Sequence, residues 1–325
     1  GRIARSLYDD SGSGKEAKTM RILIAGGCAG IRTAVRAEAE AAGCETGDFT
    51  RDAAASLHAR DAVVDLGLSP QERLPGEALI PAESERAEDV AGGVPEGVRL
   101  VRRSLVGAAP DAPDPWRRAA HAAERPALER GGIILRAGLL MGSCAESEAL
   151  VRVVKRSRLV PLPGLARARI EPLAVDDFVQ FVLLAATGPA LPGHEYDLGC
   201  GEFLTGELLV RDLAAALGIR RAGVALPGLL RGPLARAWAQ PGFPRASADH
   251  LLRALAGGLL PVRMAAWKDF DHKPRDLREC LAAAAGMTLP PRSGPRGGRF
   301  GSWEAPKARG LLGKKLRGPK RRGRG

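Results

Sequence analysis

The sequence predicts an α/β fold built on a doubly wound parallel sheet, and three observations support this prediction. Strand and helix patterns alternate along most of the chain. A glycine turn joins the first apolar strand to the first helix. The 325 residues, 45% of them hydrophobic, are enough for a large core. Strands that alternate with helices are typically parallel, with right-handed crossovers between them.

The glycine turn follows the apolar strand ILIA near the start of the chain. It contains Gly26, Gly27 and Gly30 and leads directly into a helical pattern. Glycines let the backbone turn sharply and approach a pyrophosphate, and the helix N-terminus supplies unpaired N–H groups. The complete dinucleotide-binding pattern has three glycines at fixed spacing. The third position holds Arg32 when Gly26 is counted as the first, and Thr33 when Gly27 is. The turn therefore predicts a Rossmann-like sheet more strongly than it predicts a bound nucleotide.

The other strands and helices are predicted from apolar runs and from helical spacing. Thr205 is a suitable N-cap for the helix that follows it, and Gly218 is a suitable end. Residues 67–97 have little strand character, and only 78–80 could form a fourth strand. The segment is also expected to be too short for the usual fourth strand together with its helix. Strands are expected at 22–25, near 44–51, and at 61–66, 98–106, 132–137, 159–162, 168–175 and 195–198. Helices are expected at 115–130, 176–186 and 205–217.

The chain is predicted to have four parts. They are an N-terminal arm over 1–19, a Rossmann-like dinucleotide-binding domain over 20–200, a smaller α/β portion over 201–290 that serves as a substrate-type or docking region, and a basic tail over 291–325. Within the tail, residues 292–325 contain twelve Lys and Arg and one acid, Glu304, and so carry +11 of the formal charge of +12. A segment rich in Gly, Pro and Arg buries too little apolar surface to fold alone. We expect it to bind acidic protein, anionic lipid or RNA, and the alternative is a solvated tail that aids solubility.

Residue spacing argues against several kinds of site. The five cysteines are scattered without a CxxC pair, which argues against a zinc site and against a disulfide framework. Asp176 and Asp177 resemble a metal-binding pair, but acids also favour the first turn of a helix, and a helix start is the preferred interpretation. No metal site is therefore expected. No apolar run reaches the roughly 18 residues that a membrane span needs, so no transmembrane segment is expected either.

Seven segments, taken in order, resemble one known family. They are ILIAGGCAGI, VVDL, GVRLVRRSLVGA, DPWRRAAHAAE, IILRAGLLMG, LVPLPGLARARIEPLAVDDFV and YDLGCGEFLTGELLVRDLAAALG. In these segments, which lie within residues 20–230, the chain is similar to the atypical or extended short-chain dehydrogenases/reductases, which bind NAD(P)H. One branch of that family, the nucleotide-binding accessory subunit of mitochondrial respiratory complex I, is itself regarded as structural.

The resemblance also implies where catalysis would take place. Active members use a Tyr and, four residues later, a Lys that lowers the pKa of the Tyr so that the phenol can pass a proton. Those two positions hold Trp116 and Ala120 here. An indole is no proton donor in that role, and Ala120 has no charge. His121 is the next residue, but one position along a helix turns it about 100° away. No catalytic residue is therefore expected.

The cofactor that the resemblance implies is NADP(H), and the alternative is that none is bound. Arg51 would face the 2′-phosphate, since guanidinium pairs well with phosphate, or would be an exposed loop arginine. Asp65 would border the adenine, or would simply end a strand. Arg32 would either clamp a phosphate or block the site. The residues expected at the cofactor are Gly26, Gly27, Gly30, Ile31, Arg51, Asp65 and Ser104.

These expectations favour a non-catalytic, structural protein. It would be an accessory subunit of a large organellar assembly, most specifically mitochondrial complex I, on the matrix side of the inner membrane. One alternative is an RNA-binding organellar ribosomal protein built on a degenerate reductase fold. Another is an active NAD(P)H-dependent reductase or epimerase that uses other residues.

Overall fold

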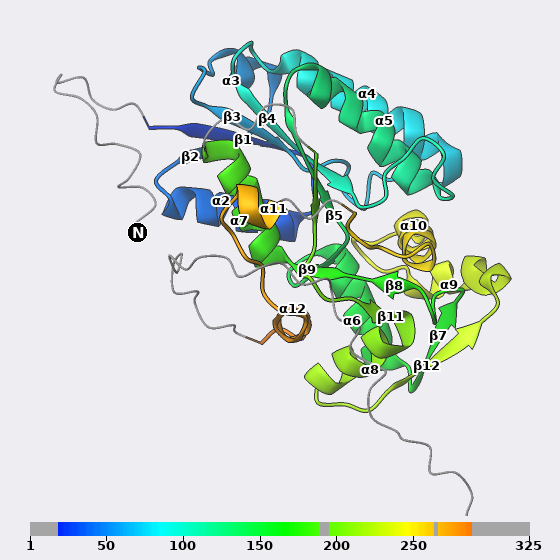
Figure 1. Cartoon of the computed structure of the whole chain (residues 1–325). Helices are drawn as coiled ribbons and strands as arrows, with labels where there is room; N and C mark the ends of the chain where they lie inside the picture. The colour runs from blue at the N-terminus through cyan, green and yellow to red at the C-terminus, as the bar shows by residue number, and fades with distance from the viewer. Residues whose placement is uncertain (1–18, 189–194, 263–265, 288–325) are drawn as a thin grey trace, which may run out of the picture.

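The computed structural model of the chain describes residues 19–188, 195–262 and 266–287. At its centre lies a six-stranded sheet with the order β10-β5-β4-β3-β1-β2 (Figure 1). All five pairings are parallel, which confirms the predicted α/β fold with a parallel sheet. The strands are β1 (Arg21–Ala25), β2 (Glu45–Asp48), β3 (Ala62–Asp65), β4 (Arg99–Leu105), β5 (Ile133–Ala137) and β10 (Glu195–Leu198).

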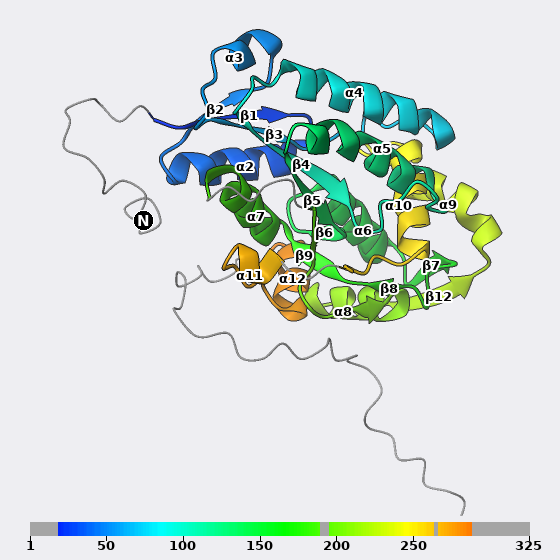
Figure 2. The same ribbon diagram turned by 45° about the horizontal axis from the view of Figure 1, so that its top comes forward.

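Helices cover both faces of this sheet. On one face lie α4 (Leu79–Gly93) and α5 (Pro115–Glu129), and on the other lie α2 (Ala29–Ala41) and α7 (Val175–Thr187), as Figures 1 and 2 show. Successive side chains of a strand point to opposite faces, so both faces of the central strands need apolar residues. In β4, for example, Leu100 packs in the core beneath α4 and α5, whereas Val101 packs in the core beneath α2 and α7.

The strand order creates a crevice at the carboxyl ends of β1 and β3. The chain runs from β1 to β2 on one side and then crosses to β3 on the other side of β1. The short helix α3 (Arg51–Ala55) belongs to this crossover. Ligands of open α/β sheets bind where the direction of winding reverses in this way. The fold therefore places a candidate site beside the glycine turn that follows β1.

The predicted strand at 78–80 is wrong, because these residues begin a helix. A single 3₁₀ turn, η1 (Gly76–Ala78), leads into the 15-residue helix α4. Leu79, Glu83, Ala87 and Val90 are buried along it at intervals of three and four. This helical period extends well beyond the three apolar residues that suggested a strand. The segment 67–97 thus holds a full helix and no strand. It was expected to be too short for a strand together with a helix.

The rest of the described chain forms a second layer of short elements. Three two-stranded ladders pair β6 (Leu139–Met141) with β9 (Pro172–Ala174), β7 (Leu159–Pro163) with β12 (Ala222–Leu226), and β8 (Arg169–Ile170) with β11 (Leu204–Thr205). The helices are α6 (Ala145–Arg156), α8 (Gly206–Ala216), α9 (Arg231–Trp238), α10 (Arg245–Ala256), α11 (Ala266–Asp269) and α12 (Leu277–Ala284), with a 3₁₀ turn η2 (Gly228–Leu230) before α9.

Three predictions for the C-terminal half of the chain can be compared directly with the structure. Thr205 caps α8 as expected, since its hydroxyl accepts a hydrogen bond from the Leu208 N–H. The single strand expected at 168–175 is instead two strands, β8 and β9, separated at Glu171. Asp176 and Asp177 lie in the first turn of α7, which confirms the preferred interpretation of this pair as a helix start.

Three buried carboxylates bind backbone N–H groups in the C-terminal half of the chain. Glu171 accepts a hydrogen bond from the Gly201 N–H at 2.6 Å. Asp197 accepts one from the Val262 N–H, and Asp177 accepts one from the Arg275 N–H, each at 2.7 Å. These carboxylates thereby attach distant loops to the central sheet and to α7.

The basic tail over 291–325 and residues 1–18 of the arm lie outside the described residues. No helix within the described ranges is long and apolar enough to cross a membrane. Within the same ranges, no group of three His, Cys, Asp or Glu side chains is placed to hold a metal ion.

Glu171 gives the fold a testable dependence on pH. Burial raises the pKa of this carboxyl from 4.5 to about 7, although the Gly201 N–H opposes the shift. The folded state then holds the proton more tightly than the unfolded state, so the stability that Glu171 contributes is fully present below pH 4.5 and is lost as the pH rises towards 7. We expect Glu171→Gln to remove this loss and to make the protein more stable at pH 8, by up to about 3 kcal/mol.

Urea unfolding at pH 5 and at pH 8 measures the effect. The exposed Glu129→Gln on α5 is the matched control and should leave the dependence on pH unchanged. If the free energy of unfolding changed equally between pH 5 and pH 8 in Glu171→Gln and in the unmodified protein, the assignment of the raised pKa to Glu171 would be wrong.

Candidate functional site

The two loops at the crevice are bonded to each other. The Gly27 N–H donates a hydrogen bond to the Gly67 carbonyl oxygen at 2.8 Å, which joins the turn after β1 to the loop after β3. Gly26 and Gly27 have φ angles of +62° and +78°. This left-handed conformation favours glycine, so the sharp turn itself requires residues without a side chain.

Each glycine of the turn also lies against another part of the chain. A Cβ atom placed on Gly26 would lie less than 3.0 Å from the Gly67 carbonyl and from the Arg86 guanidinium. One on Gly27 would overlap the Leu66 side chain, and one on Gly30 would overlap the Ser143 carbonyl. The protein's own packing therefore explains all three glycines, without a ligand.

The other residues expected at a cofactor are engaged elsewhere. The Ile31 side chain is fully buried in the core beneath α2. Arg51, the first residue of α3, is exposed and forms an ion pair with Asp89 of α4. Arg32 forms an ion pair with Asp48, and both side chains are partly exposed. The structure thus brings the three glycines together and leaves Arg51 apart from them on an exposed helix.

Asp65 stands in a different place from the one that the resemblance implied. In the strand order 3-2-1-4-5-6, a third strand lies outside the second. Here β3 pairs with β1 at the centre of the sheet, and no strand in the described part of the chain lies outside β2. Asp65 therefore ends a central strand, where its carboxylate is almost completely buried.

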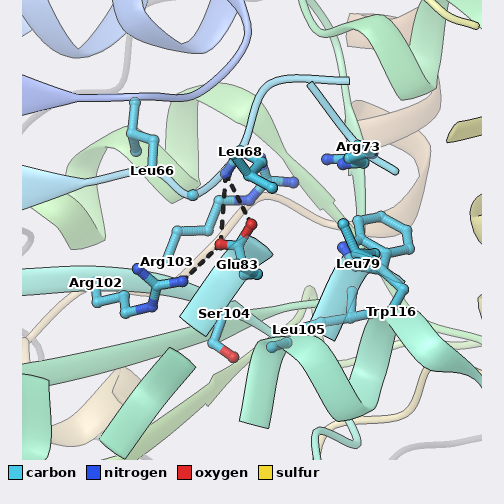
Figure 3. A pocket seen from close by; sticks show the side chains of 12 residues that line it. Leu66, Leu68, Arg73, Leu79, Glu83, Arg102, Arg103, Ser104, Leu105 and Trp116 are labelled. Atoms are coloured by element: carbon cyan, nitrogen blue, oxygen red, sulfur yellow. Dashed lines mark hydrogen bonds and ion pairs between the residues drawn. The ribbon is translucent and has the colours of Figure 1, made fainter. Parts of the chain in front are cut away.

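Asp65 belongs to a buried network of charges between the sheet and α4. It forms ion pairs with Arg86 and with Arg102 of β4. Arg102 also pairs with Glu83 at 2.6 Å, and Figure 3 shows this second pair. Burial alone would raise the pKa of Asp65, but the Arg102 and Arg86 guanidiniums outweigh burial and lower it. The Asp65 carboxylate accordingly stays ionised as a structural partner of the two arginines.

Ser104 takes part in a second buried network, on the α5 side. Its hydroxyl donates a hydrogen bond to Glu124 at 2.5 Å. Glu124 in turn accepts two hydrogen bonds from Arg136, at 2.6 and 2.7 Å, and Arg136 also reaches Glu195. His121 lies 3.7 Å from Glu124 at the edge of this group. The Ser104 hydroxyl is therefore committed to a buried carboxylate.

A pocket lies between these two networks, at the carboxyl end of β4 (Figure 3). Trp116 and Ala120, at the positions of the expected Tyr and Lys, form part of its wall. The Arg73 guanidinium lies 4.4 Å from the centre of the Trp116 ring. The pocket thus presents an indole, a methyl group and arginines.

Sequence reasoning missed most of these charges. Glu83 occupies a buried position on α4, and Arg102 lies in the middle of a central strand. A charged residue at an apolar position of a helix or strand signals a buried partner, and these two positions carried that signal. Asp48 was also not predicted as a site residue. It ends β2, where dinucleotide-binding folds place the acid that binds the ribose. Here it is paired with Arg32 and Arg36.

Comparison with known proteins identifies the fold. No family profile matches the chain, and no curated protein sequence matches it. Solved structures do match across most of the chain. A nucleoside-diphosphate-sugar epimerase from Staphylococcus aureus has a TM-score of 0.60 and 16% identity, covering 81% of this chain and 100% of the other. This chain shares the fold of NAD(P)-binding epimerases and reductases.

Two further structures support the same statement. The human epimerase family protein SDR39U1 with NADPH has a TM-score of 0.53 and 20% identity, covering 82% of this chain and 99% of the other. The quinone oxidoreductase QOR2 from Escherichia coli, complexed with NADPH, has a TM-score of 0.60 and 15% identity, covering 80% and 98%. At these identities, the likeness concerns the fold alone.

The glycine turn is tightly packed within the protein. The Ser143 carbonyl oxygen lies against Gly30, and Arg86 and the Gly67 carbonyl lie against Gly26. The Gly27 N–H is bonded to the Gly67 carbonyl oxygen, so this donor of the turn is engaged within the chain.

The contact between Gly30 and Ser143 can be tested by one substitution. We expect Gly30→Ala to destabilise the protein by about 1–3 kcal/mol, because the methyl group must displace a backbone carbonyl. Gly92→Ala on α4 is the control: nothing lies within 4 Å of its Cβ position, and alanine should stabilise the helix by about 0.5–1 kcal/mol. Urea unfolding without any nucleotide measures both changes. A Gly30→Ala protein as stable as the unmodified protein would show that Ser143 does not pack here.

Proposed function

We propose that this protein is a non-catalytic member of the reductase-type fold and that it acts as a structural subunit of a larger assembly. The observation that carries the proposal is the pocket at the end of β4. Trp116 and Ala120 line it where the active members of the resembling family hold Tyr and Lys, and the Ser104 hydroxyl is bound to Glu124. None of these groups is placed to pass a proton to a substrate.

The filled glycine turn supports the same proposal. A reductase or epimerase of this fold needs its nicotinamide cofactor for hydride transfer. In this chain the Ser143 carbonyl, the Gly67 carbonyl and Arg86 lie against the turn that would hold the cofactor. The parallel sheet and its covering helices are present, so in this proposal the fold is retained for its architecture and not for a cofactor.

A more specific proposal concerns the kind of complex to which this subunit belongs. The sequence segment 292–325, with its formal charge of +11, suits contact with acidic protein, anionic lipid or RNA. Together with the resemblance to a structural branch of the family, this supports an accessory subunit of a large organellar complex. Mitochondrial complex I, on the matrix side of the inner membrane, is the specific candidate.

The absence of catalysis has a direct test. With a large excess of NADPH or NADH, we expect no rise in melting temperature and no loss of nicotinamide absorbance with nucleotide-sugar or quinone substrates. The Escherichia coli quinone oxidoreductase, assayed beside it, is the positive control. The double variant Trp116→Tyr with Ala120→Lys should also stay inactive, because the turn remains filled. Turnover by the unmodified protein would refute the proposal and favour an active reductase or epimerase.

Membership of an assembly is tested separately. On native gels of gently solubilised source membranes, we expect the protein to migrate with a complex much larger than its own 34.1 kDa. A chain truncated after residue 291 should be incorporated less. Migration as a free monomer would contradict the proposal, and release by nuclease would favour the RNA-binding alternative.

A further inference from the structure

The strand β12 has a neighbouring strand on one edge only. It pairs in parallel with β7, and within the described ranges these two strands form a sheet of their own. Helix α8 packs against β12, and Figures 1 and 2 show the strand on the outer side of β7. In the described part of the chain, the edge of β12 that faces away from β7 therefore has no strand beside it.

Hydrogen bonds at the two ends of β12 show which of its main-chain groups face β7. The Ala222 N–H donates to the Arg158 carbonyl oxygen at 3.3 Å. At the other end, the Leu226 carbonyl oxygen accepts from the Gly164 N–H at 2.9 Å. Both end residues of β12 thus direct their main-chain groups towards β7.

The residues between these ends present main-chain groups to the open edge. Successive residues of a strand direct their N–H and C=O groups to its two edges in turn, so Gly223 and Ala225 point away from β7. Ala225 is exposed and Gly223 is partly exposed. Among the described residues, no loop or side chain is recorded as bonded to either N–H. Such a row of unpaired N–H and C=O groups is a template for another strand.

The open edge of β12 is unprotected, whereas the outer edge of β7 is blocked. Edge strands usually avoid pairing through charged residues, prolines or bulges. β12 has the sequence AGVAL and pairs with β7 through all five residues without a bulge. In β7, Pro161 and Pro163 alternate with the positions that face β12, so they remove donors from its other edge. The ladder is therefore closed on the β7 side and open on the β12 side.

Basic side chains gather at the amino end of this ladder. Leu159 and Ala222 are in register, so the residues that precede the two strands lie side by side. Arg221 donates hydrogen bonds to carbonyl oxygens at the end of α6, which brings that helix end to the same place. Four exposed cations result, and no ion pair is recorded for them in the described part of the chain: Lys155, Arg156, Arg158 and Arg220. An acid, Glu207 of α8, lies beside Gly223 instead.

We propose that the open edge of β12 binds an extended, acidic segment of a partner protein. The segment adds a third strand, and its main chain exchanges hydrogen bonds with Gly223 and Ala225. Its carboxylates meet Arg158 and Arg220 at the amino end of the ladder. This contact deepens the structural role proposed above and rests on it, since it gives the subunit a surface for a partner.

Charge decides between the possible occupants of the edge. The segment 292–325 of this chain has a formal charge of +11 and would be repelled by the four cations. A second copy of β12 would bring the same cations and no carboxylate of its own. An acidic strand supplies both the main-chain groups and the opposite charge.

Hydrogen exchange of the full chain tests the contact directly. The probe is a synthetic peptide of alternating Thr and Val with glutamates at both ends, and the control peptide has lysines in place of the glutamates. In the free protein, we expect the amides of Gly223 and Ala225 to exchange faster than those of Ala222 and Val224. The acidic peptide should slow exchange at Gly223 and Ala225 by at least about tenfold, and the basic peptide should not.

Two variants separate the main-chain contact from the charge. Ala225→Pro removes an N–H at the open edge and leaves the bonds to β7, so we expect it to fold and to bind the acidic peptide at least about tenfold more weakly. Arg220→Glu should weaken binding by a similar factor through repulsion, and it tests the site even if the proline variant fails to fold. Arg60→Glu, which changes an exposed arginine in the turn before β3, is the matched control and should bind normally.

Each opposite result would overturn the proposal. All three variants keep the basic tail, so equal binding by all of them would show that the tail holds the peptide. Slow exchange at Gly223 and Ala225 without peptide would show that the edge is already occupied, by a second copy if the protection depends on protein concentration. Migration as a free monomer on native gels would refute the structural role alone, because the peptide binding is measured on the isolated chain.

Discussion

The Arg102 guanidinium is buried on the α4 side of the central strand β4. Its charge must be neutralised there, and the carboxylates that do so also hold the loop after β3. Asp65 and Glu83 supply two carboxylates, and Arg86 then balances the pair. Glu83 also accepts a hydrogen bond from the Leu68 N–H, so the same carboxylate fixes the loop after β3. Removing one member of a buried ion pair typically costs about 3–5 kcal/mol, because the remaining charge has no partner. These contacts therefore link α4 to β3, to β4 and to the loop after β3.

The loop after β3 is also bonded to the glycine turn after β1. The loop after β3 is held by Glu83, and its Gly67 carbonyl then meets the Gly27 N–H. In a dinucleotide-binding protein, the N–H groups of such a turn can face the pyrophosphate. Here the Gly27 N–H donates to the Gly67 carbonyl, so the turn is bonded to the neighbouring loop. Packing within the chain is therefore sufficient to require glycine at these positions.

The sequence was sufficient to predict the elements that have a strong period. The β1 strand, the cap at Thr205 and the parallel sheet follow from apolar runs and local chemistry. The strand at 78–80 failed because three apolar residues also suit the start of a helix. In the candidate site, Trp116 and Ala120 lie in the pocket wall, and their spacing of four on α5 is a local feature that the sequence shows directly. The charge networks were not predicted, because ion pairs such as Arg73 with Glu146 join residues 73 positions apart.

The loop after α10 is held through its main chain, and this has an evolutionary consequence. Asp197 recognises the N–H group of Val262, which every residue except proline possesses. The Val262 side chain itself is 82% exposed. The loop after α11 differs, because Asp177 binds the Arg275 N–H while the buried Arg275 side chain also pairs with Asp176 and Glu279. Divergence should therefore be rapid at position 262 and slow at Arg275 and at the two aspartates.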